Sequence, residues 1–312
     1  MLYLVTGGAG FIGSHIVEKL VQAGERVRVL DNFSSGRREN LKPFLDKIEL
    51  VEGDIRDFWT VIQAVEGVDF ILHQAALTSV QRSIKNPLTT NEVNINGTLN
   101  ILEAAKIHKI KRLVYASSSS VYGDTPTLPK IETMSPAPIS PYAISKLAGE
   151  EYCLVFYRVY GLETVCLRYF NVFGPKQNPL SEYAGVIPRF ILSLLNSQKP
   201  NIYGDGEQSR DFTYVENVVQ ANLKACLAES ITGESINIAC NQRYSINQLW
   251  NTLTRITAKR LEPLFLDSKP GDIRHSLADI SKAKKLLGYQ VKIDFEEGLK
   301  KTLDYYRKLN SL

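Results

Sequence analysis

Short apolar runs alternate with longer amphipathic stretches, and this alternation restricts the possible fold more than any other feature. Six runs are apolar enough to be buried strands, at residues 3–6, 26–30, 48–53, 69–73, 112–116 and 164–169. The stretches between them, such as 12–24 and 98–109, repeat their apolar residues at helical spacing. Repeated strand–helix units predict an α/β fold with a doubly wound parallel sheet.

The second half of the chain follows a looser pattern. Prolines cluster between residues 126 and 141 and predict a loop, followed by a helix with Ser140 as N-cap, Pro141 in its first turn and Gly161 at its end. After about residue 172 the alternation loosens. Further helices are expected near 185–197, 215–229, 245–257 and 294–309. We therefore expect a main domain over residues 1–172, to which 212–240 return, and a smaller C-terminal α/β lobe over 173–312 that faces the substrate.

Composition excludes several classes of protein. The chain has 312 residues, of which 44% are hydrophobic, and its net charge of +4 comes without a basic block, so neither nucleic acid nor a membrane is expected as a partner. No apolar run reaches the ~20 residues that cross a bilayer, and no signal peptide is visible. The four cysteines lack metal-binding spacing and the four histidines are scattered. These features predict a cytoplasmic protein with buried, reduced thiols and no metal site.

A glycine-rich turn follows the first predicted strand. In "TGGAGFIGSH", Gly7, Gly10 and Gly13 are spaced G-x-x-G-x-x-G between a strand and a helix. Glycines there let the backbone approach a pyrophosphate at the positive end of the helix. The motif alone is a weak signal, because glycine-rich turns without a ligand also show it.

The ends of the next strands strengthen this interpretation. Asp31 comes 18 positions after Gly13 and can accept hydrogen bonds from both hydroxyls of an adenosine ribose. The same carboxylate would repel a 2′-phosphate, which favours NAD over NADP. Arg37 and Arg38 favour the phosphate instead, unless they are solvated charges of a loop. The third strand ends in Asp54 and Ile55, which can bracket an adenine, and the small Ala75 and Ala76 follow the fourth.

Tyr142 and Lys146 share one face of the predicted helix, because they are four residues apart. An ammonium beside a tyrosine stabilises the phenolate, and the tyrosine can then act as a base near neutral pH. An isolated Y-x-x-x-K is more often a surface pair. Here the pair follows a nucleotide-binding half and a strand that ends in four serines, Ser117–Ser120, so a catalytic role is favoured.

Taken together, the motifs resemble the extended short-chain dehydrogenase/reductases of the nucleotide-sugar 4-epimerase kind, which act on UDP-glucose or UDP-N-acetylglucosamine. The resemblance covers nearly the whole chain through "GGAGFIGSH", "GDI", "NINGTLNILEAA", "ASSSSVYGD", "SPYAISK", "LRYFNVFGP", "DGEQSRDFTYVENV" and "ISKAKKLLGY". It implies a Rossmann fold, bound NAD and a UDP-sugar substrate. It also implies a homodimer that pairs through helices near 88–108 and 142–160.

The resemblance assigns roles within the serine run. It places the catalytic hydroxyl on Ser118, 24 positions before Tyr142, and makes Ser119 a secondary contact to the sugar, although a shift by one position stays open. Ser117 and Ser120 are expected to bond local backbone groups. Similar dehydratases carry an Asp-Glu pair just before "VYG" and decarboxylases a Glu, whereas this chain has Ser119 and Ser120. The implied reaction is therefore reversible hydride transfer at C4 through a 4-keto sugar, with Tyr142 as base.

The resemblance further implies two sets of binding residues. The cofactor contacts are Gly7, Gly10, Phe11, Ile12, Gly13, Asp31, Asn32, Ser34, Ser35, Gly36, Asp54, Ile55, Gln74, Ala75, Ala76, Asn94, Tyr142, Lys146 and Phe170. The substrate contacts are Ser118, Ser119, Tyr142, Asn171, Gly185, Val186, Tyr203, Arg210, Asp272, Arg274 and Ser276. In this set the two arginines and Asn171 would hold the diphosphate and Asp272 the uridine ribose. Lys269 departs from the family pattern, in which an arginine is common.

Ser276 bears on the choice of sugar. Relatives limited to UDP-glucose and UDP-galactose can have a tyrosine at this position, and a small residue there implies that N-acetylated hexoses are accepted too. Alternatively, Ser276 only turns the chain into a helix beginning near Asp279. Two other functions stay open, namely another nucleotide-sugar oxidoreductase or modifying enzyme and a non-catalytic NAD-binding regulator.

Overall fold

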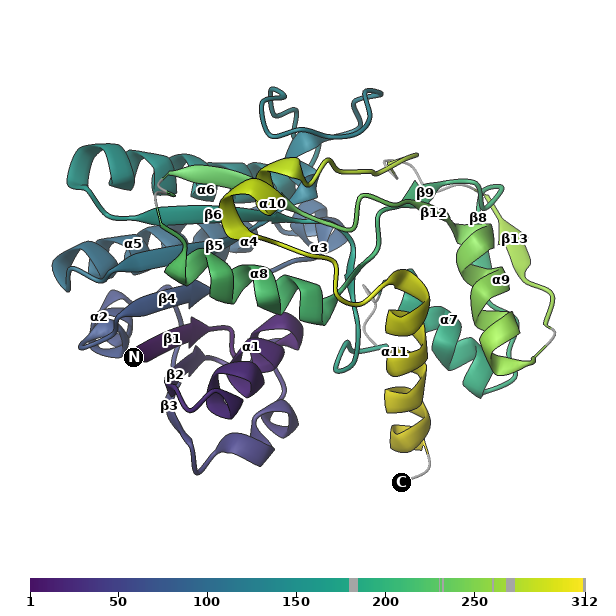
Figure 1. Ribbon diagram of the computed structural model, residues 1–312, viewed down its shortest axis with the longest axis horizontal. Helices are drawn as coiled ribbons and strands as arrows, with labels where there is room; N and C mark the ends of the chain where they lie inside the picture. The colour runs from purple at the N-terminus through teal and green to yellow at the C-terminus, as the bar shows by residue number, and fades with distance from the viewer. Residues whose placement is uncertain (180–184, 230, 232, 260, 268–272, 311–312) are drawn as a thin grey trace.

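A seven-stranded parallel sheet forms the centre of the molecule, with strand order β11-β6-β5-β4-β1-β2-β3. The computed structural model describes residues 1–179, 185–229, 231, 233–259, 261–267 and 273–310 (Figure 1). The strands of this sheet are β1 Leu2–Thr6, β2 Arg26–Asp31, β3 Ile48–Glu52, β4 Phe70–His73, β5 Arg112–Ser118, β6 Thr164–Tyr169 and β11 Glu234–Ile238. The predicted doubly wound parallel sheet is confirmed.

Helices cover both faces of the sheet, which is why its central strands β1, β4 and β6 are buried along their whole length. In β1, Tyr3 and Val5 pack into one hydrophobic core, while Leu2 and Leu4 pack into the other. The first core is closed by α1 Phe11–Gln22, α8 Val215–Leu227 and α10 Ser281–Leu287. The second is closed by α2 Phe58–Val65, α5 Gly97–Ile107 and α6 Pro141–Tyr160.

The strand order reverses at β1, because β2 and β3 continue on one side of it and β4, β5 and β6 on the other. In open parallel sheets a ligand crevice forms at such a reversal, beyond the carboxyl ends of the strands. The strand β5 reaches Ser118, two residues further than the predicted end at residue 116. The first two serines of the run therefore belong to the strand itself, and a short 3-10 turn, η4 Ser119–Tyr122, follows.

The ends of helix α6 form as the sequence predicts. The Ser140 side chain accepts a hydrogen bond from the backbone N–H of Ala143 at 3.2 Å, and Pro141 begins the helix. Gly161 closes it in the left-handed conformation, with φ 71°.

The single helix expected over 88–108 is divided. After α3 Val80–Lys85, the chain forms α4 Pro87–Asn91, a π-helical turn η3 Glu92–Asn96, and then α5. The π turn directs Asn94 inwards, where it binds the backbone N–H and C=O of Leu77 at 2.8 and 3.0 Å and the Ser145 hydroxyl at 2.9 Å. These bonds explain why a π turn interrupts the helix, since they give both the oxygen and the nitrogen of the buried Asn94 side chain a hydrogen-bond partner.

The smaller lobe lies beyond the carboxyl ends of the strands (Figure 1). Its helices are α7 Val186–Leu195, α9 Ile246–Thr257 and α11 Phe295–Asn310, within two residues of the predicted ranges. The remaining short elements are β7 Val172–Phe173, β8 Asn201–Tyr203, β9 Ser209–Arg210, β10 Thr213–Tyr214, β12 Tyr244–Ser245, β13 Leu264–Leu266, η1 Arg38–Asn40 and η2 Lys42–Phe44.

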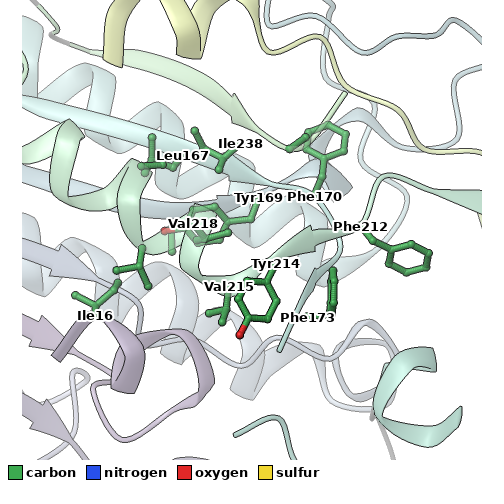
Figure 2. Close-up of a cluster of buried hydrophobic side chains, with 14 of the residues drawn as sticks. Ile16, Leu167, Tyr169, Phe170, Phe173, Phe212, Tyr214, Val215, Val218 and Ile238 are labelled. Atoms are coloured by element: carbon green, nitrogen blue, oxygen red, sulfur yellow. The ribbon is translucent and has the colours of Figure 1, made fainter. Parts of the chain in front are cut away.

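Aromatic side chains join this lobe to the sheet. The Phe173 ring lies 6.3 Å from that of Phe212, 5.6 Å from that of Tyr214 and 6.1 Å from that of Phe295. Figure 2 shows part of this cluster beside Val215 at the start of α8. The lobe therefore shares one continuous core with the face of the sheet that α1 and α8 cover.

The described residues contain neither a group of side chains that could hold a metal ion nor a helix with the length and apolar character needed to span a bilayer. All four cysteines are free thiols. Cys153, Cys166 and Cys226 are buried as expected, whereas Cys240 is only partly buried.

Candidate active site

A cavity of about 680 Å³ opens at the carboxyl ends of β1 to β5, where the strand order reverses. It brings together most of the predicted cofactor contacts: Gly7, Gly10, Phe11, Ile12, Gly13, Asp31, Asn32, Ser34, Ser35, Asp54, Ile55, Gln74, Ala75, Ala76, Tyr142 and Lys146. Of the predicted substrate contacts, it holds Ser118, Ser119, Tyr142, Asn171 and Gly185.

The glycine-rich turn is too tight for side chains. Gly7 has φ 67°, and a Cβ added to it would lie 2.8 Å from the backbone nitrogen of Ala75. A Cβ at Gly13 would lie 2.2 Å from the carbonyl oxygen of Gly7. The turn therefore leaves the N-terminal end of α1 open to the cavity, which suits a pyrophosphate.

Asp31 is fixed at the end of β2. Its carboxylate accepts hydrogen bonds from the backbone N–H groups of Ala9 at 2.9 Å and Phe33 at 2.8 Å. Burial raises the pKa of Asp31, and these two bonds oppose the shift. Gly36 does not line the cavity, but a Cβ there would lie 2.9 Å from both carboxylate oxygens. Glycine at that position therefore preserves room around the group predicted to bind the ribose.

The loop arginines that raised the question of NADP are engaged with nearby carboxylates. Arg38 pairs with Glu52 at 2.6 Å, and Arg37, which lines the cavity, lies 3.7 Å from Glu39.

Asp54 is ionised and oriented at the end of β3. Hydrogen bonds from Arg56, with Nη2 at 2.8 Å, lower the pKa of Asp54 to about 2. The same carboxylate accepts from the Asn32 amide at 2.8 Å. Because Ile55 lies beside it in the cavity lining, the predicted polar and apolar bracket for an adenine is in place.

Tyr142 and Lys146 reach the cavity from α6, although both are largely buried, with 8% and 3% of their surfaces exposed. Burial raises the pKa of Tyr142, and a hydrogen bond from the Ser118 side chain opposes the shift. Burial lowers the pKa of Lys146 to about 8, against the opposing charge of Glu150. The Lys146 ammonium donates to the Ala116 carbonyl at 2.8 Å.

The four serines have different surroundings. The Ser118 hydroxyl also accepts from the backbone N–H of Ser120 at 3.1 Å, and Ser119 and Ser120 line the cavity. The expectation that Ser117 and Ser120 bond backbone groups through their side chains is wrong. Ser117 donates to the Glu150 carboxylate, and the buried Ser120 hydroxyl has no hydrogen-bond partner among the described residues.

The substrate residues divide between two adjoining cavities. Val186, Tyr203 and Arg210 line a second cavity of about 290 Å³, which shares Asn171 and Gly185 with the main one. Ser276 lies beside this junction, since its hydroxyl accepts from the Asn171 amide at 3.3 Å.

Two other expectations concern the phosphate-binding side. Arg274, predicted to hold a phosphate, instead forms a two-pronged ion pair with Asp205 at 2.8 and 2.7 Å, and both side chains are exposed. A phosphate would therefore have to compete with this carboxylate. Asp272 and Lys269 lie outside the described residues.

Asn94 and Phe170 support the site without lining the cavity. Asn94 anchors Leu77, which follows the small residues after β4, and Phe170 is buried with its ring 6.1 Å from that of Tyr122. Sequence reasoning missed Tyr169, Lys176, Gln177 and Asn178, all of which line the cavity. The polar run "PKQN" at residues 175–178, one glycine after β7, was the available signal for the last three.

Comparison with known proteins places the chain in a family. Residues 3–239 match the NAD dependent epimerase/dehydratase family. The solved structure of UDP-N-acetylglucosamine 4-epimerase from Methanobrevibacter ruminantium M1, in complex with UDP-N-acetylmuramic acid, is 41% identical, with 98% of each chain covered and a TM-score of 0.95. A protein of Methanocaldococcus jannaschii described as a putative UDP-glucose 4-epimerase is 40% identical over 99% of both chains.

A relative with different chemistry is also similar. The UDP-N-acetyl-alpha-D-glucosaminuronate decarboxylase of Bacillus cytotoxicus is 35% identical over 99% of this chain and 98% of its own length. The predicted fold, family resemblance and cofactor are confirmed at the level that these relatives share. Sequence, fold and the glycine turn agree that this chain belongs to the NAD dependent epimerase/dehydratase family, with NAD as its cofactor.

Proposed function

We propose that this protein is a 4-epimerase of UDP-hexoses that interconverts UDP-N-acetylglucosamine with UDP-N-acetylgalactosamine and UDP-glucose with UDP-galactose. In this proposal residues 1–172, together with 212–240, hold NAD, and 173–312 supply the lobe that binds the UDP-sugar. The proposal goes beyond the family assignment by naming one reaction, since similar proteins in the family include epimerases and a decarboxylase.

The position of the carboxylates in the cavity favours epimerisation over the other reactions of the family. Among the described residues that line the main cavity, the carboxylates are Asp31 and Asp54, and both stand at the ends of β2 and β3 where the adenosine is expected. Around Tyr142 the cavity is lined by serines instead, with the hydroxyl-bearing Ser118 and Ser119 among them. Elimination on a sugar needs a group that removes a proton from carbon, and no described carboxylate at this end of the cavity can do so.

The side chains at this end suit proton transfer at a sugar hydroxyl. Ser118 and Tyr142 both line this end of the cavity, so a 4-hydroxyl placed between them would contact both. Tyr142 would take the proton of that hydroxyl, with Lys146 behind it as a nearby ammonium. NAD, when bound, supplies a reversible hydride acceptor for C4. The 4-keto sugar would then turn over and regain its hydride on the other face.

A panel of UDP-sugars followed by NMR tests the proposal. The purified protein should convert UDP-N-acetylglucosamine, UDP-N-acetylgalactosamine, UDP-glucose and UDP-galactose each to its 4-epimer. Decarboxylation of a UDP-uronic acid, without epimerisation of any of these four, would replace the proposal with the chemistry of the decarboxylase relative.

The substrate range should depend on Ser276. Its hydroxyl contacts Asn171 at the junction of the two cavities, and the next helix, α10, begins only at Ser281. A tyrosine there would occupy space beside the sugar, and overpacking of this kind costs about 1–3 kcal/mol, or roughly 10- to 100-fold in rate. We expect Ser276→Tyr to lower kcat/KM by that factor for N-acetylated sugars and much less for UDP-galactose.

The matched control is Ser276→Ala, which removes the hydroxyl without adding volume and should keep activity on both sugar pairs. A wild-type protein inactive on N-acetylated sugars, or a tyrosine variant slowed equally on both pairs, would refute this role of Ser276.

We also propose that the protein is a homodimer. Apolar side chains are exposed along α3, α4 and α6, among them Ile84 (56%), Leu88 (77%), Ile144 (53%) and Val159 (65%). On α6, Ile144, Val155 and Val159 are spaced so that they share one face of the helix. A second copy of the chain could cover this face through the same helices.

Light scattering tests the dimer. Val159→Arg with Leu88→Arg should convert a dimer to a monomer, because two charges would enter an apolar interface. Phe265→Arg is the control, since Phe265 is 52% exposed on β13 in the smaller lobe. A monomeric wild-type protein, or an unchanged mass in the double variant, would contradict the proposal.

A further inference from the structure

We propose that Glu150 is a positioning residue for the Ser118–Tyr142 pair, because its buried carboxylate fastens the serine-bearing end of β5 to helix α6. The inference rests on the proposed epimerase function for its kinetic consequences. Its structural part concerns only how two elements of this chain hold two hydroxyls together.

Glu150 lies in the interior, with 5% of its surface exposed. Its carboxylate accepts a hydrogen bond from the Ser117 hydroxyl and another from that of Ser235 at 3.2 Å. Arg168 donates to both carboxylate oxygens, with Nε at 2.9 Å from Oε1 and Nη2 at 2.7 Å from Oε2. Because Ser117 directly precedes Ser118, its bond to Glu150 ties the end of β5 to α6 at the residue before the reacting hydroxyl.

The charge of Glu150 is balanced from the neighbouring strand. Arg168 lies opposite Ser117 in the register of β5 and β6 and is itself 5% exposed. Its Nη1 donates to the Tyr122 hydroxyl at 2.9 Å, and that hydroxyl donates to the Asn237 side chain at 2.8 Å. A buried carboxylate is unfavourable unless it is paired and hydrogen-bonded in this way. The arrangement links β5, β6, β11 and α6 beneath the cavity.

Helix α6 contacts the end of β5 residue by residue. Three consecutive residues of the strand each contact a different residue of the helix: Tyr115 contacts Gly149, Ala116 contacts Lys146 and Ser117 contacts Glu150. The first contact requires glycine, because a Cβ at position 149 would lie 2.2 Å from the tyrosine hydroxyl. The Glu150 contact is therefore part of a continuous junction that runs up to Ser118, which lines the cavity together with Tyr142.

This placement predicts an effect on the titration of Tyr142. The hydrogen bond from Ser118 lowers the pKa of Tyr142, so a looser junction should raise that pKa. Glu150 also opposes the fall in the pKa of Lys146 that burial causes. The other titratable groups packed around this pair are His73 from β4, Tyr115 from β5, Cys153 from α6 and Cys166 from β6. Burial lowers the pKa of His73 to about 3, so it is neutral across the range of the experiment.

The test uses Glu150→Gln and Ser117→Ala in the full-length protein. The glutamine keeps the shape but offers one carbonyl oxygen where the carboxylate offered two to Arg168 and Ser117, while the alanine removes only the link to the strand. The tyrosinate absorbance of each protein is measured as a function of pH, and the curve of the same protein carrying Tyr142→Phe is subtracted. The difference reports Tyr142 alone among the 15 tyrosines. In both variants we expect the Tyr142 step to move up by roughly one pH unit and kcat to fall about tenfold with little change in KM.

The matched control is Glu163→Gln. Glu163 pairs with Arg112 at 2.6 Å, and Arg112 is nearly buried at the opposite end of β5. This control should lower the melting temperature but leave kcat and the Tyr142 step unchanged. An unchanged step in Ser117→Ala and Glu150→Gln, or an equal change in Glu163→Gln, would overturn the inference.

The design separates a variant that fails to fold, and a wild-type protein without epimerase activity, from a failure of the role proposed for Glu150. If Glu150→Gln does not fold, Ser117→Ala decides alone, because it leaves the Glu150–Arg168 pair intact. If the wild-type protein epimerises no UDP-sugar, the proposed function fails, but the Tyr142 titration needs no substrate and still decides the role of Glu150.

Discussion

Tyr142→Phe will lower kcat by at least ~10²-fold, the usual effect of losing a general base, while the protein stays folded and keeps its NAD. The substitution removes only the phenolic hydroxyl group. The backbone N–H of Tyr142 donates to Ser83 at 3.1 Å, and phenylalanine retains this bond. Tyr142 is buried, with 8% of its surface exposed, and phenylalanine retains the ring and therefore its packing.

The measurement is the rate of epimerisation beside the NAD content of the purified protein. Equal NAD content in the variant and the wild-type protein would show that the cofactor site is intact. A variant that keeps more than half of the wild-type kcat would remove Tyr142 from the reaction.

Ser118→Ala should have the second largest effect, about 10²-fold in kcat, because it removes a hydrogen bond aimed at the reacting hydroxyls. Burial raises the pKa of Tyr142, and Ser118 is the member of the serine run whose side chain opposes this shift. Ser120→Ala should change kcat little, since the Ser120 hydroxyl has no partner among the described residues and its backbone N–H, which binds Ser118, remains.

The Ser118 hydroxyl also caps the turn η4, so a second variant separates the two roles. Ser118→Thr keeps a hydroxyl and should recover much of the lost activity. Equal losses in the two alanine variants, or a larger loss at Ser120, would mean that the catalytic position within the run is shifted.

The sequence could predict a feature of the structure where the residue type at a position has only one physical explanation. Gly7 and Gly13 were predictable because only glycine fits a turn in which a Cβ would contact backbone at 2.8 Å or less. Six of the seven strands of the sheet were predictable from their apolar runs, because helices cover both faces of the sheet, whereas β11 was not among the predicted strands. Tyr142 and Lys146 were predictable from helical spacing, since the helix around them carries clear N-cap and C-terminal signals.

The features that escaped prediction depend on contacts between distant segments. Ser117 was expected to bond the local backbone, but its partner Glu150 comes from another element 33 residues later. The ion pair of Arg274 with Asp205, 69 positions earlier, was also not predicted, and the role of Arg274 at a phosphate stays a prediction. The π turn at Asn94 likewise depends on Leu77 and Ser145, and local propensity carries no signal of either partner.

Return of the hydride to C4 is tested by incubating the purified protein, without added cofactor, with UDP-N-acetylglucosamine that carries deuterium at C4. Proton and deuterium NMR then follow both epimers. We predict that UDP-N-acetylgalactosamine forms until equilibrium, with the deuterium retained at C4, because the hydride removed from the sugar returns to the same carbon. Loss of the deuterium to solvent, or conversion only with stoichiometric added NAD, would contradict epimerisation by hydride return within this active site.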